Sequence, residues 1–340
     1  MKKVFCFGEL LLRLSPATGG EWIPQASLPV FVGGAELNVA TALSRWNIPV
    51  KYATVLPDHY LSQDIIADLQ SKRIDTSAIL FAGQRIGLYY LSQGADLKHT
   101  SVIYDRAHSS FSSLLPGQID WDAALKDCNW FHFSAISPAL NESVAAVCLE
   151  GLEAASAKGL TISVDLNYRS KLWQYGKQPV QIMPQLVAYA DVIMGNIWAA
   201  EALLGIHCPI ADSRHQSPEM LVNAAQKSMQ DIHSAYPNAN TIAFTFRLDD
   251  HYFAVLRQAG AITVSKTFAL ESIVDKIGSG DCFMGGLIYG LHEHQPPQAI
   301  IDFAAAAAVG KMKETGDSTH QSVESVHKIV TTAWTTTNPS

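Results

Sequence analysis

The stretch IVDKIGSGDCFMGG, residues 273–286, joins an apolar, strand-like end to a glycine turn and then to a helix of small residues. Gly278 and Gly280 have no Cβ atom, so the backbone of the turn can adopt conformations closed to other residues and approach a ligand closely. The amides at the start of the helix have no intrahelical partner and carry about half a positive charge between them. A turn of this kind is suited to binding a phosphate group.

Asp281 follows the turn directly. A carboxylate is a poor phosphate ligand because like charges repel, but it suits a base that takes a proton from a hydroxyl attacking that phosphate. The alternative is a tight strand-to-helix turn in which Asp281 caps the helix, since Asp is a favoured N-cap residue. These residues alone do not decide between a base and a cap.

Composition excludes several classes of protein. The chain has 340 residues, of which 48% are hydrophobic and 16% charged, and this allows a large buried core. A net charge of −7 offers no basic surface for nucleic acid. The five cysteines are scattered without CxxC spacing, which predicts reduced thiols in a cytoplasmic protein. No apolar run reaches the length of a membrane span, so we expect no membrane partner.

Strand-like and helical segments alternate along most of the chain. This alternation predicts an α/β fold of three layers, with a mostly parallel central sheet covered by helices on both faces. The segments expected as strands of this sheet are 4–7, 50–55, 130–135, 161–166, 191–194, 241–245, 252–256 and 262–266. The segments expected as helices are 35–46, 61–71, 143–158, 179–188, 281–292, 297–313 and 322–332. No linker or repeat divides the chain, so residues 1–340 are predicted to form one domain.

Other strand-like runs depart from this alternation. Residues 87–91 and 101–105 are separated by polar residues, which is typical of an antiparallel pair outside the main sheet. Residues 28–32 have the character of an edge strand, because their proline cannot donate to a central ladder. Together these runs predict a small β-sheet lid, inserted at about 13–32 and 86–110.

The lid also contains Tyr104 and Arg106, on either side of an aspartate. An Arg flanked by Tyr can hold a planar acid through paired hydrogen bonds. The alternative is a solvated hairpin end without a ligand.

Polar residues follow several of the predicted strands, at the edge where ligands of parallel sheets bind. Gly33 and Gly34 open a helix, and Asn38 lies one turn inside it with a donor and an acceptor for a small ligand. A plain turn followed by a polar helix start is the alternative. Asn196 follows the strand that ends at residue 194, and capping of a helix is the usual reason for Asn there.

The strand that ends near residue 165 continues as D-x-N-x-R-x-K. Asp165 and Asn167 are expected on one strand face, with Arg169 and Lys171 just beyond the sheet edge. These cations suit a carboxylate or a phosphate. The alternative is a surface group of ion pairs.

Taken together, these motifs resemble those of the ribokinase-like (PfkB) carbohydrate kinases, over essentially the whole chain and in the same order. The most specific part is Asp275-x-x-Gly278-Ser279-Gly280-Asp281. Within the family the chain is most similar to 2-keto-3-deoxygluconate kinases, in the stretches 8–16, 103–107, 165–173 and 245–247. The resemblance implies a ribokinase-like fold, with ATP and Mg²⁺ as cofactors. It also implies phosphoryl transfer to the C6 hydroxyl of 2-keto-3-deoxygluconate or a close keto-deoxy sugar acid.

The resemblance implies roles for individual residues. Asp281 is the implied general base, and the amides of Gly278, Ser279 and Gly280 are the implied anion hole for the γ-phosphoryl group. The residues implied to bind the sugar acid are Gly33, Gly34, Asn38, Tyr90, Tyr104, Arg106, Arg169 and Asp317. The residues implied to lie toward ATP are Lys171, Asn196, Thr245, Gly278 and Gly280. Asp275 matches a position that in some members supports a monovalent cation such as K⁺.

Three positions differ from patterns common in the family. Arg13 stands where relatives acting on neutral sugars often carry an Asp, and this favours an acidic substrate because a desolvated carboxylate would repel it. Ala199 replaces a Glu that often organises Mg²⁺ through water, so no protein ligand for the metal is assigned and Mg²⁺ is expected mainly on the ATP phosphates. Residues 245–250 replace the usual glycine-containing adenine loop.

The main expectation is an ATP-dependent kinase for a sugar acid. The alternatives are a kinase for a neutral sugar such as fructose, and a catalytically weak sensor of a sugar acid or nucleotide. The stereochemistry of the acid stays open between gluconate- and galactonate-derived forms. A homo-oligomer is expected, because a lid with exposed apolar strands often pairs with a copy of itself.

Overall fold

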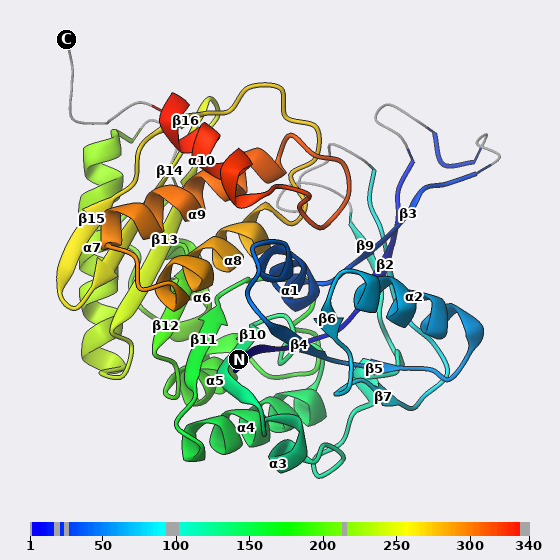
Figure 1. Ribbon diagram of the computed structural model, residues 1–340. Helices are drawn as coiled ribbons and strands as arrows, with labels where there is room; N and C mark the ends of the chain where they lie inside the picture. Colours follow the sequence, from blue (N-terminus) through cyan, green and yellow to red (C-terminus); the bar gives the residue numbers. More distant parts are fainter. Residues whose placement is uncertain (1, 17–20, 24–26, 93–101, 213–215, 334–340) are drawn as a thin grey trace.

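The computed structural model describes residues 2–16, 21–23, 27–92, 102–212 and 216–333. A ten-stranded sheet runs through the molecule in the order β15-β14-β13-β12-β11-β10-β1-β4-β6, with β16 beside β14 (Figure 1). Its strands are β1 (Lys3–Phe7), β4 (Val50–Ala53), β6 (Ile74–Asp75), β10 (Cys128–Ser134), β11 (Thr161–Asp165), β12 (Val192–Gly195), β13 (Thr241–Arg247), β14 (His251–Gln258), β15 (Ala261–Val264) and β16 (Phe268–Ala269). Pairing is parallel from β13 to β6 and antiparallel among β13 to β16.

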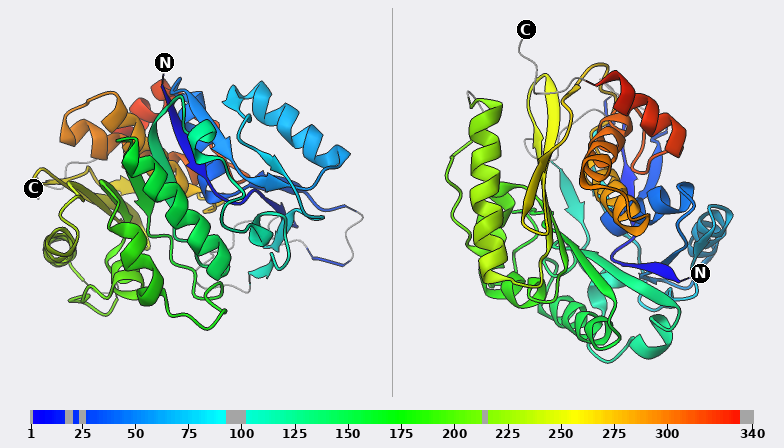
Figure 2. Two further views of the ribbon diagram at one scale, coloured as in Figure 1. Left: turned by 90° about the horizontal axis from the view of Figure 1, so that it is seen from below. Right: turned by 60° about the vertical axis from the view of Figure 1, so that its left-hand side comes forward.

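Helices cover both faces of this sheet. Along β1, the side chains of Val4 and Cys6 join one hydrophobic core and those of Phe5 and Phe7 join the other, because successive strand residues point to opposite faces. On the first face lie α1 (Ala35–Arg45), α2 (Tyr60–Ser71), α8 (Ser279–His292), α9 (Pro297–Lys311) and α10 (Val323–Thr332). On the second lie α3 (Trp121–Ala124), α4 (Glu142–Ala157), α5 (Pro179–Val187), α6 (Ile197–Leu204) and α7 (Pro218–Ala235). Figure 2 shows the orange and red helices on one side of the sheet and the green helices on the other, which confirms the predicted layers.

A second, smaller sheet stands apart from the first, at the upper right of Figure 1. Its strands are β2 (Leu11–Leu14), β3 (Val30–Gly33), β8 (Gly87–Tyr90) and β9 (Ile103–Asp105), in the order β3-β2-β8-β9. β8 and β9 pair antiparallel and β3 is an edge strand, as predicted. Residues 17–20, 24–26 and 93–101, which the predicted lid includes, lie outside the described residues. Two further short strands, β5 (Val55–Leu56) and β7 (Leu80–Phe81), pair with each other.

β2 and α7 were not predicted, and neither were the short elements β6, β7, β16 and α3, while α6 was indicated only by the expected cap at Asn196. β2 is only four residues long and contains Arg13, and it forms because β3 and β8, distant in sequence, pair with it on either side. α7 did carry a signal, since Leu221, Ala224, Ala225, Ser228, Met229 and Ile232 are buried at helical spacing. Its start is also marked, because Ser217 caps the helix ahead of a proline at the first helical position.

Two composition-based expectations can be compared with the structure. All five cysteines are unpaired and buried. Within the part of the chain that the structure describes, no helix combines the length and apolar character needed to cross a membrane.

Candidate active site

The glycine turn opens α8 at the carboxyl edge of the sheet. Gly278 is the N-cap, with a φ of 76°, and the helix begins at Ser279. A Cβ atom on Gly278 would lie 1.8 Å from the carbonyl oxygen of Asp317, so both the backbone angle and the space require glycine here. Asp281 is therefore the third residue of the helix, and the alternative in which it is the N-cap is wrong. The left-handed Gly278 starts the helix earlier than that alternative assumed.

Asp281 is buried at the junction of α1 and α8. Its Oδ2 accepts a hydrogen bond of 2.7 Å from Asn38 Nδ2, and Asn38 Oδ1 accepts one of 2.9 Å from Ser318 Oγ. Burial raises the pKa of Asp281 to about 6, and the hydrogen bond from Asn38 opposes that rise. A carboxylate with a pKa just below neutrality can be ionised at pH 7 and still accept a proton during a reaction.

Two glycines bring the start of α1 against this site. Gly33 ends β3, and a Cβ atom on it would lie 2.3 Å from Asp317 Oδ2. Gly34 is the N-cap of α1 with a φ of 137°, and a Cβ atom on it would lie 2.3 Å from the carbonyl oxygen of Glu9. The close packing that these glycines allow places Asn38 one helical turn further along, within reach of Asp281.

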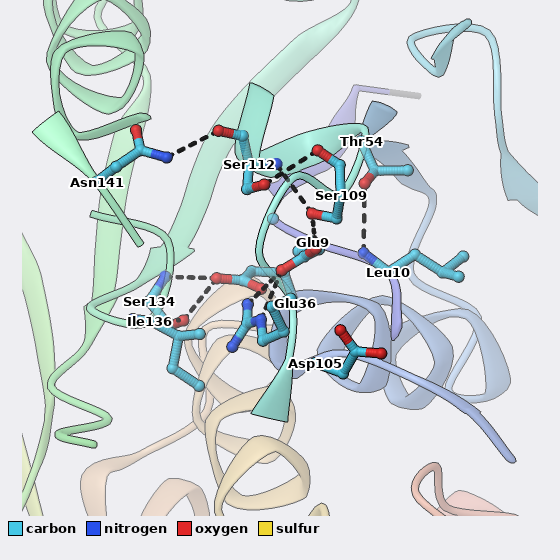
Figure 3. A network of polar contacts seen from close by, with 12 residues as sticks. Glu9, Leu10, Glu36, Thr54, Asp105, Ser109, Ser112, Ser134, Ile136 and Asn141 are labelled. Atoms are coloured by element: carbon cyan, nitrogen blue, oxygen red, sulfur yellow. Dashed lines mark hydrogen bonds and ion pairs between the residues drawn. The ribbon is translucent and has the colours of Figure 1, made fainter. Parts of the chain in front are cut away.

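Two more buried carboxyl groups lie near Asp281. Burial raises the pKa of Asp165, at the end of β11, well above its ordinary value, and the charges of Asp281 and Glu36 add to the rise. Burial likewise raises the pKa of Glu36 to about 7, although its Oε1 accepts hydrogen bonds from Ser134 N at 2.8 Å and Ser134 Oγ at 2.6 Å (Figure 3). The positive charge of Arg169 acts on both Asp165 and Asp281 and opposes these shifts.

Arg169 is thus the predicted cation that the structure brings to the carboxyl groups. It is half-buried, and its Nη1 donates to the carbonyl oxygen of Tyr168 at 3.0 Å. Asn167 does not share a strand face with Asp165 as expected, because β11 ends at Asp165.

Arg13, Asp275 and Asp317 form a buried ionic group behind the glycine turn. Arg13 is 0% exposed, and its Nη2 lies 2.6 Å from Asp275 Oδ2 while its Nε lies 2.9 Å from Asp317 Oδ1. Tyr89 donates a hydrogen bond of 2.5 Å to Asp317 Oδ2. Arg13 therefore neutralises two carboxylates of the protein. The carboxylate of Asp317 is likewise held within the protein.

The order of these elements and the glycine turn can be compared with known proteins. The sequence profile described as pfkB family carbohydrate kinase matches residues 1–323. The chain belongs to the PfkB family of carbohydrate kinases.

Relatives of this kinase include enzymes named for keto-deoxy sugar acids. The crystal structure of 2-dehydro-3-deoxygluconokinase from Thermotoga maritima is 33% identical, with a TM-score of 0.88, and the match covers 97% of this chain and 100% of that one. A 2-dehydro-3-deoxygalactonokinase from Haloferax volcanii is 29% identical over 324 residues, 95% of each chain. A putative ribokinase from E. coli, in complex with ATP and Mg²⁺, shares the fold at 18% identity and a TM-score of 0.73, covering 98% of this chain and 100% of that one.

Arg106 of the kinase is engaged in an internal ion pair. Its Nη2 and Nε lie 2.6 Å and 2.7 Å from Oε2 of Glu9, and both side chains are buried. Ser109 Oγ donates to the other oxygen of Glu9 (Figure 3). This network joins the segment after β9 to the loop between β1 and β2. Because the charge of Arg106 is already neutralised by Glu9, its guanidinium is less suited than that of Arg169 to bind a substrate carboxylate.

The two predicted tyrosines lie on the small sheet. Tyr90 is half-buried at the end of β8, and its ring lies 6.2 Å from that of Trp22. Tyr104 is half-buried on β9, with its ring 6.4 Å from that of Tyr89 and 5.9 Å from the guanidinium carbon of Arg106.

Of the residues predicted to lie toward ATP, Lys171 and Asn196 follow β11 and β12, and Thr245 lies within β13. Asn196 caps α6, with its Oδ1 accepting a hydrogen bond of 2.9 Å from Ala199 N, as its position after a strand had indicated. Thr245 Oγ1 donates to the carbonyl oxygen of Gly195 at 3.4 Å. Lys171 is exposed and donates to the carbonyl oxygen of Val102 at 3.0 Å, so its ammonium lies beside the small sheet.

The side chains that the structure describes do not form a metal cage. Among the described residues there is no group of three or more His, Cys, Asp or Glu side chains that could hold a metal ion. Ala199, buried on α6, adds no oxygen ligand. This donor set fits a Mg²⁺ ion that is carried largely by the phosphates of ATP.

Sequence reasoning missed three residues of this region. Glu36 lies in the first turn of α1, and an acidic residue just after paired glycines is a signal that was available. Ser318 supports Asn38 from the loop after α9, a contact that only the fold creates. Lys311 ends α9, whose run of buried alanines marks a helix enclosed on all sides and so predicts a buried lysine.

Proposed function

We propose that this kinase transfers the γ-phosphoryl group of ATP to the C6 hydroxyl of 2-keto-3-deoxygluconate or a close keto-deoxy sugar acid. The observation that carries the proposal is the Asp281 carboxylate beside the Gly278 turn, held by Asn38 and with a pKa raised to about 6. This arrangement combines a base and a phosphate site within one helical turn, which phosphoryl transfer to a hydroxyl requires.

In the proposed reaction, Asp281 takes the proton of the C6 hydroxyl as its oxygen attacks the γ-phosphorus in line. A new bond forms between that oxygen and phosphorus, the bond to the β,γ-bridging oxygen breaks, and ADP leaves. The amides of Gly278, Ser279 and Gly280 donate to the phosphoryl oxygens, where negative charge spreads in the transition state. Mg²⁺, when bound with ATP, supplies further charge neutralisation at the phosphates.

Two observations support an acidic substrate, namely the position of Arg169 and the names of related enzymes. Arg169 is the half-buried cation beside Asp165 and Asp281, and we propose that it holds the carboxylate of the sugar acid. Asn38 and the backbone at Gly33 and Gly34 would lie along the sugar, with Tyr90 and Tyr104 across it. The relatives in Thermotoga maritima and Haloferax volcanii carry names of gluconate- and galactonate-derived acids respectively, so both epimers are candidates.

We further propose that the small sheet acts as a lid of a single kinase domain and excludes water from the reaction. Asn196, Thr245 and Lys171 are proposed to lie on the ATP side. The small sheet and the segment beside it expose apolar side chains, among them Ile23 at 91%, Val30 at 54% and Ile103 at 60%. Such a surface supports assembly into a homo-oligomer.

An assay of ADP release tests the substrate. It compares 2-keto-3-deoxygluconate, 2-keto-3-deoxygalactonate, fructose, ribose and gluconate, each with ATP and Mg²⁺. Turnover is expected on one or both keto-deoxy acids. Faster turnover on fructose would replace the proposal with a neutral-sugar kinase. Saturable binding without turnover on any sugar would favour a sensor.

A further inference from the structure

The position expected to support a monovalent cation does not fit one in this chain. Asp275 is 0% exposed, and its Oδ2 is bound by Arg13 at 2.6 Å. Its Oδ1 accepts a hydrogen bond of 3.1 Å from Ile277 N, within the loop that leads to the glycine turn. A K⁺ ion near Asp275 would therefore face a carboxylate whose charge is already balanced, with a guanidinium beside it.

A second buried cation lies against the same turn. Lys311, at the end of α9, is 0% exposed. Its Nζ donates to the carbonyl oxygen of Glu314 at 3.4 Å, and its Cε would lie 3.5 Å from a Cβ atom built on Gly278. The lysine side chain thus runs along the back of the turn, on the side where the loop after α9 returns.

Four buried ionic groups behind the turn balance one another without an added ion. Two cations, Arg13 and Lys311, and two carboxylates, Asp275 and Asp317, are all at most 3% exposed. Burial lowers the pKa of Lys311, and the charges of Asp275 and Asp317 oppose that shift. With both cations charged, the four groups sum to zero, so this set adds no net negative charge behind the turn.

We propose that the ammonium of Lys311 is a built-in replacement for a monovalent cation, and that it orders the anion-hole turn so that the kinase works without K⁺. Lys311 is a positioning residue, since it lies behind the backbone that would face the phosphoryl group. The ammonium of Lys311 is part of the chain and is always present, whereas a free ion would first have to bind from solution.

The test uses the full-length protein and the variants Lys311→Ala and Lys313→Met. Lys313 is an exposed lysine just beyond α9, and it controls for the loss of a positive charge in the same segment. Initial rates and melting temperatures are measured in about 100 mM KCl, NaCl or tetramethylammonium chloride, so that ionic strength is constant. Wild type and Lys313→Met are expected to differ by less than about twofold in rate between salts, and their melting temperatures are expected to agree.

For Lys311→Ala, kcat in tetramethylammonium chloride is expected to fall about 10- to 100-fold, with little change in KM for the sugar. In KCl, kcat of this variant is expected to be at least about tenfold higher than in tetramethylammonium chloride, and its melting temperature is expected to be higher too. The reason is that K⁺ can enter the space beside Asp275 and Asp317. Activation of the wild type by K⁺ of about tenfold or more would overturn the inference, whether or not the variant folds. Failure of K⁺ to restore a folded Lys311→Ala variant would overturn it too.

The rate measurements rest on the proposed kinase activity, and the melting measurements do not. Absence of turnover on every sugar would refute the proposed function, while the melting temperatures would still decide the role of Lys311.

Discussion

Replacement of Asn38 by Ala is expected to shift the pH dependence of the kinase to higher pH. Asn38 Nδ2 donates a hydrogen bond of 2.7 Å to Asp281, and this bond stabilises the ionised carboxylate. Burial raises the pKa of Asp281 to about 6 in spite of that bond. Without it, burial acts unopposed by Asn38, so the pKa of Asp281 rises further.

The size of the shift follows from the kind of hydrogen bond. A hydrogen bond to a charged group contributes about 1.5–3 kcal/mol, and one pKa unit corresponds to about 1.4 kcal/mol, so the midpoint is expected to move up by about 1–2 units. A base must be ionised to act, and activity is therefore lost as pH falls through the midpoint. At pH 7 the ionised fraction of Asp281 would fall from about 90% to between about 50% and 10%, and kcat/KM by about two- to tenfold.

The measurement is kcat/KM for the preferred keto-deoxy acid between about pH 5 and 9.5, since kcat/KM reports the pKa values of the free enzyme. Ser318→Ala is the matched control, because Ser318 contacts Asn38 but leaves the bond from Asn38 to Asp281 in place. Its midpoint is expected to stay near that of the wild type. If the pH profile of kcat/KM for Asn38→Ala has a lower plateau but an unchanged midpoint, Asn38 only binds substrate. The assignment of Asp281 as the titrating base would then be refuted.

Three further predictions address other parts of the site. Asp281→Asn is expected to abolish turnover yet raise the stability of the protein at pH 7–8 by up to about 3 kcal/mol. The pKa of Asp281 rises from 3.8 to about 6 on folding, so the folded wild type loses stability as pH rises through that interval. Retained turnover, or lower stability in urea unfolding, contradicts this. Arg169→Ala is expected to raise KM for the keto-deoxy acid about tenfold or more and to leave KM for fructose unchanged. Arg106→Ala is expected instead to lower stability by about 3–5 kcal/mol, because the carboxylate of Glu9 is left buried without its cation. The reverse pattern in the two assays would exchange the roles of the two arginines. Gly278→Ala is expected to yield an inactive or unfolded protein, since its φ of 76° and a contact of 1.8 Å both exclude a Cβ atom; a folded variant with wild-type kcat would refute this.

Local patterns were sufficient for the architecture. Apolar runs separated by helical segments predicted the parallel sheet and its two helical layers, because each strand buried on both faces must be apolar along its length. The glycine turn before α8 was recognisable for a similar reason, since few residues other than glycine adopt a φ of 76°. β2 escaped prediction because four residues with an arginine among them form a strand only when β3 and β8 are beside them.

The sequence by itself determined the glycine turn before α8, the aspartate that follows it and the presence of cations at the sheet edge. Only the tertiary structure decided which cations remain available. Arg13, Arg106 and Lys311 have the same formal charge as Arg169, but burial requires partners for a charged group, and the fold supplies Asp275, Asp317 and Glu9 from distant segments. Arg169 stays half-buried beside Asp281, and this difference in burial is a property of packing that no single stretch encodes.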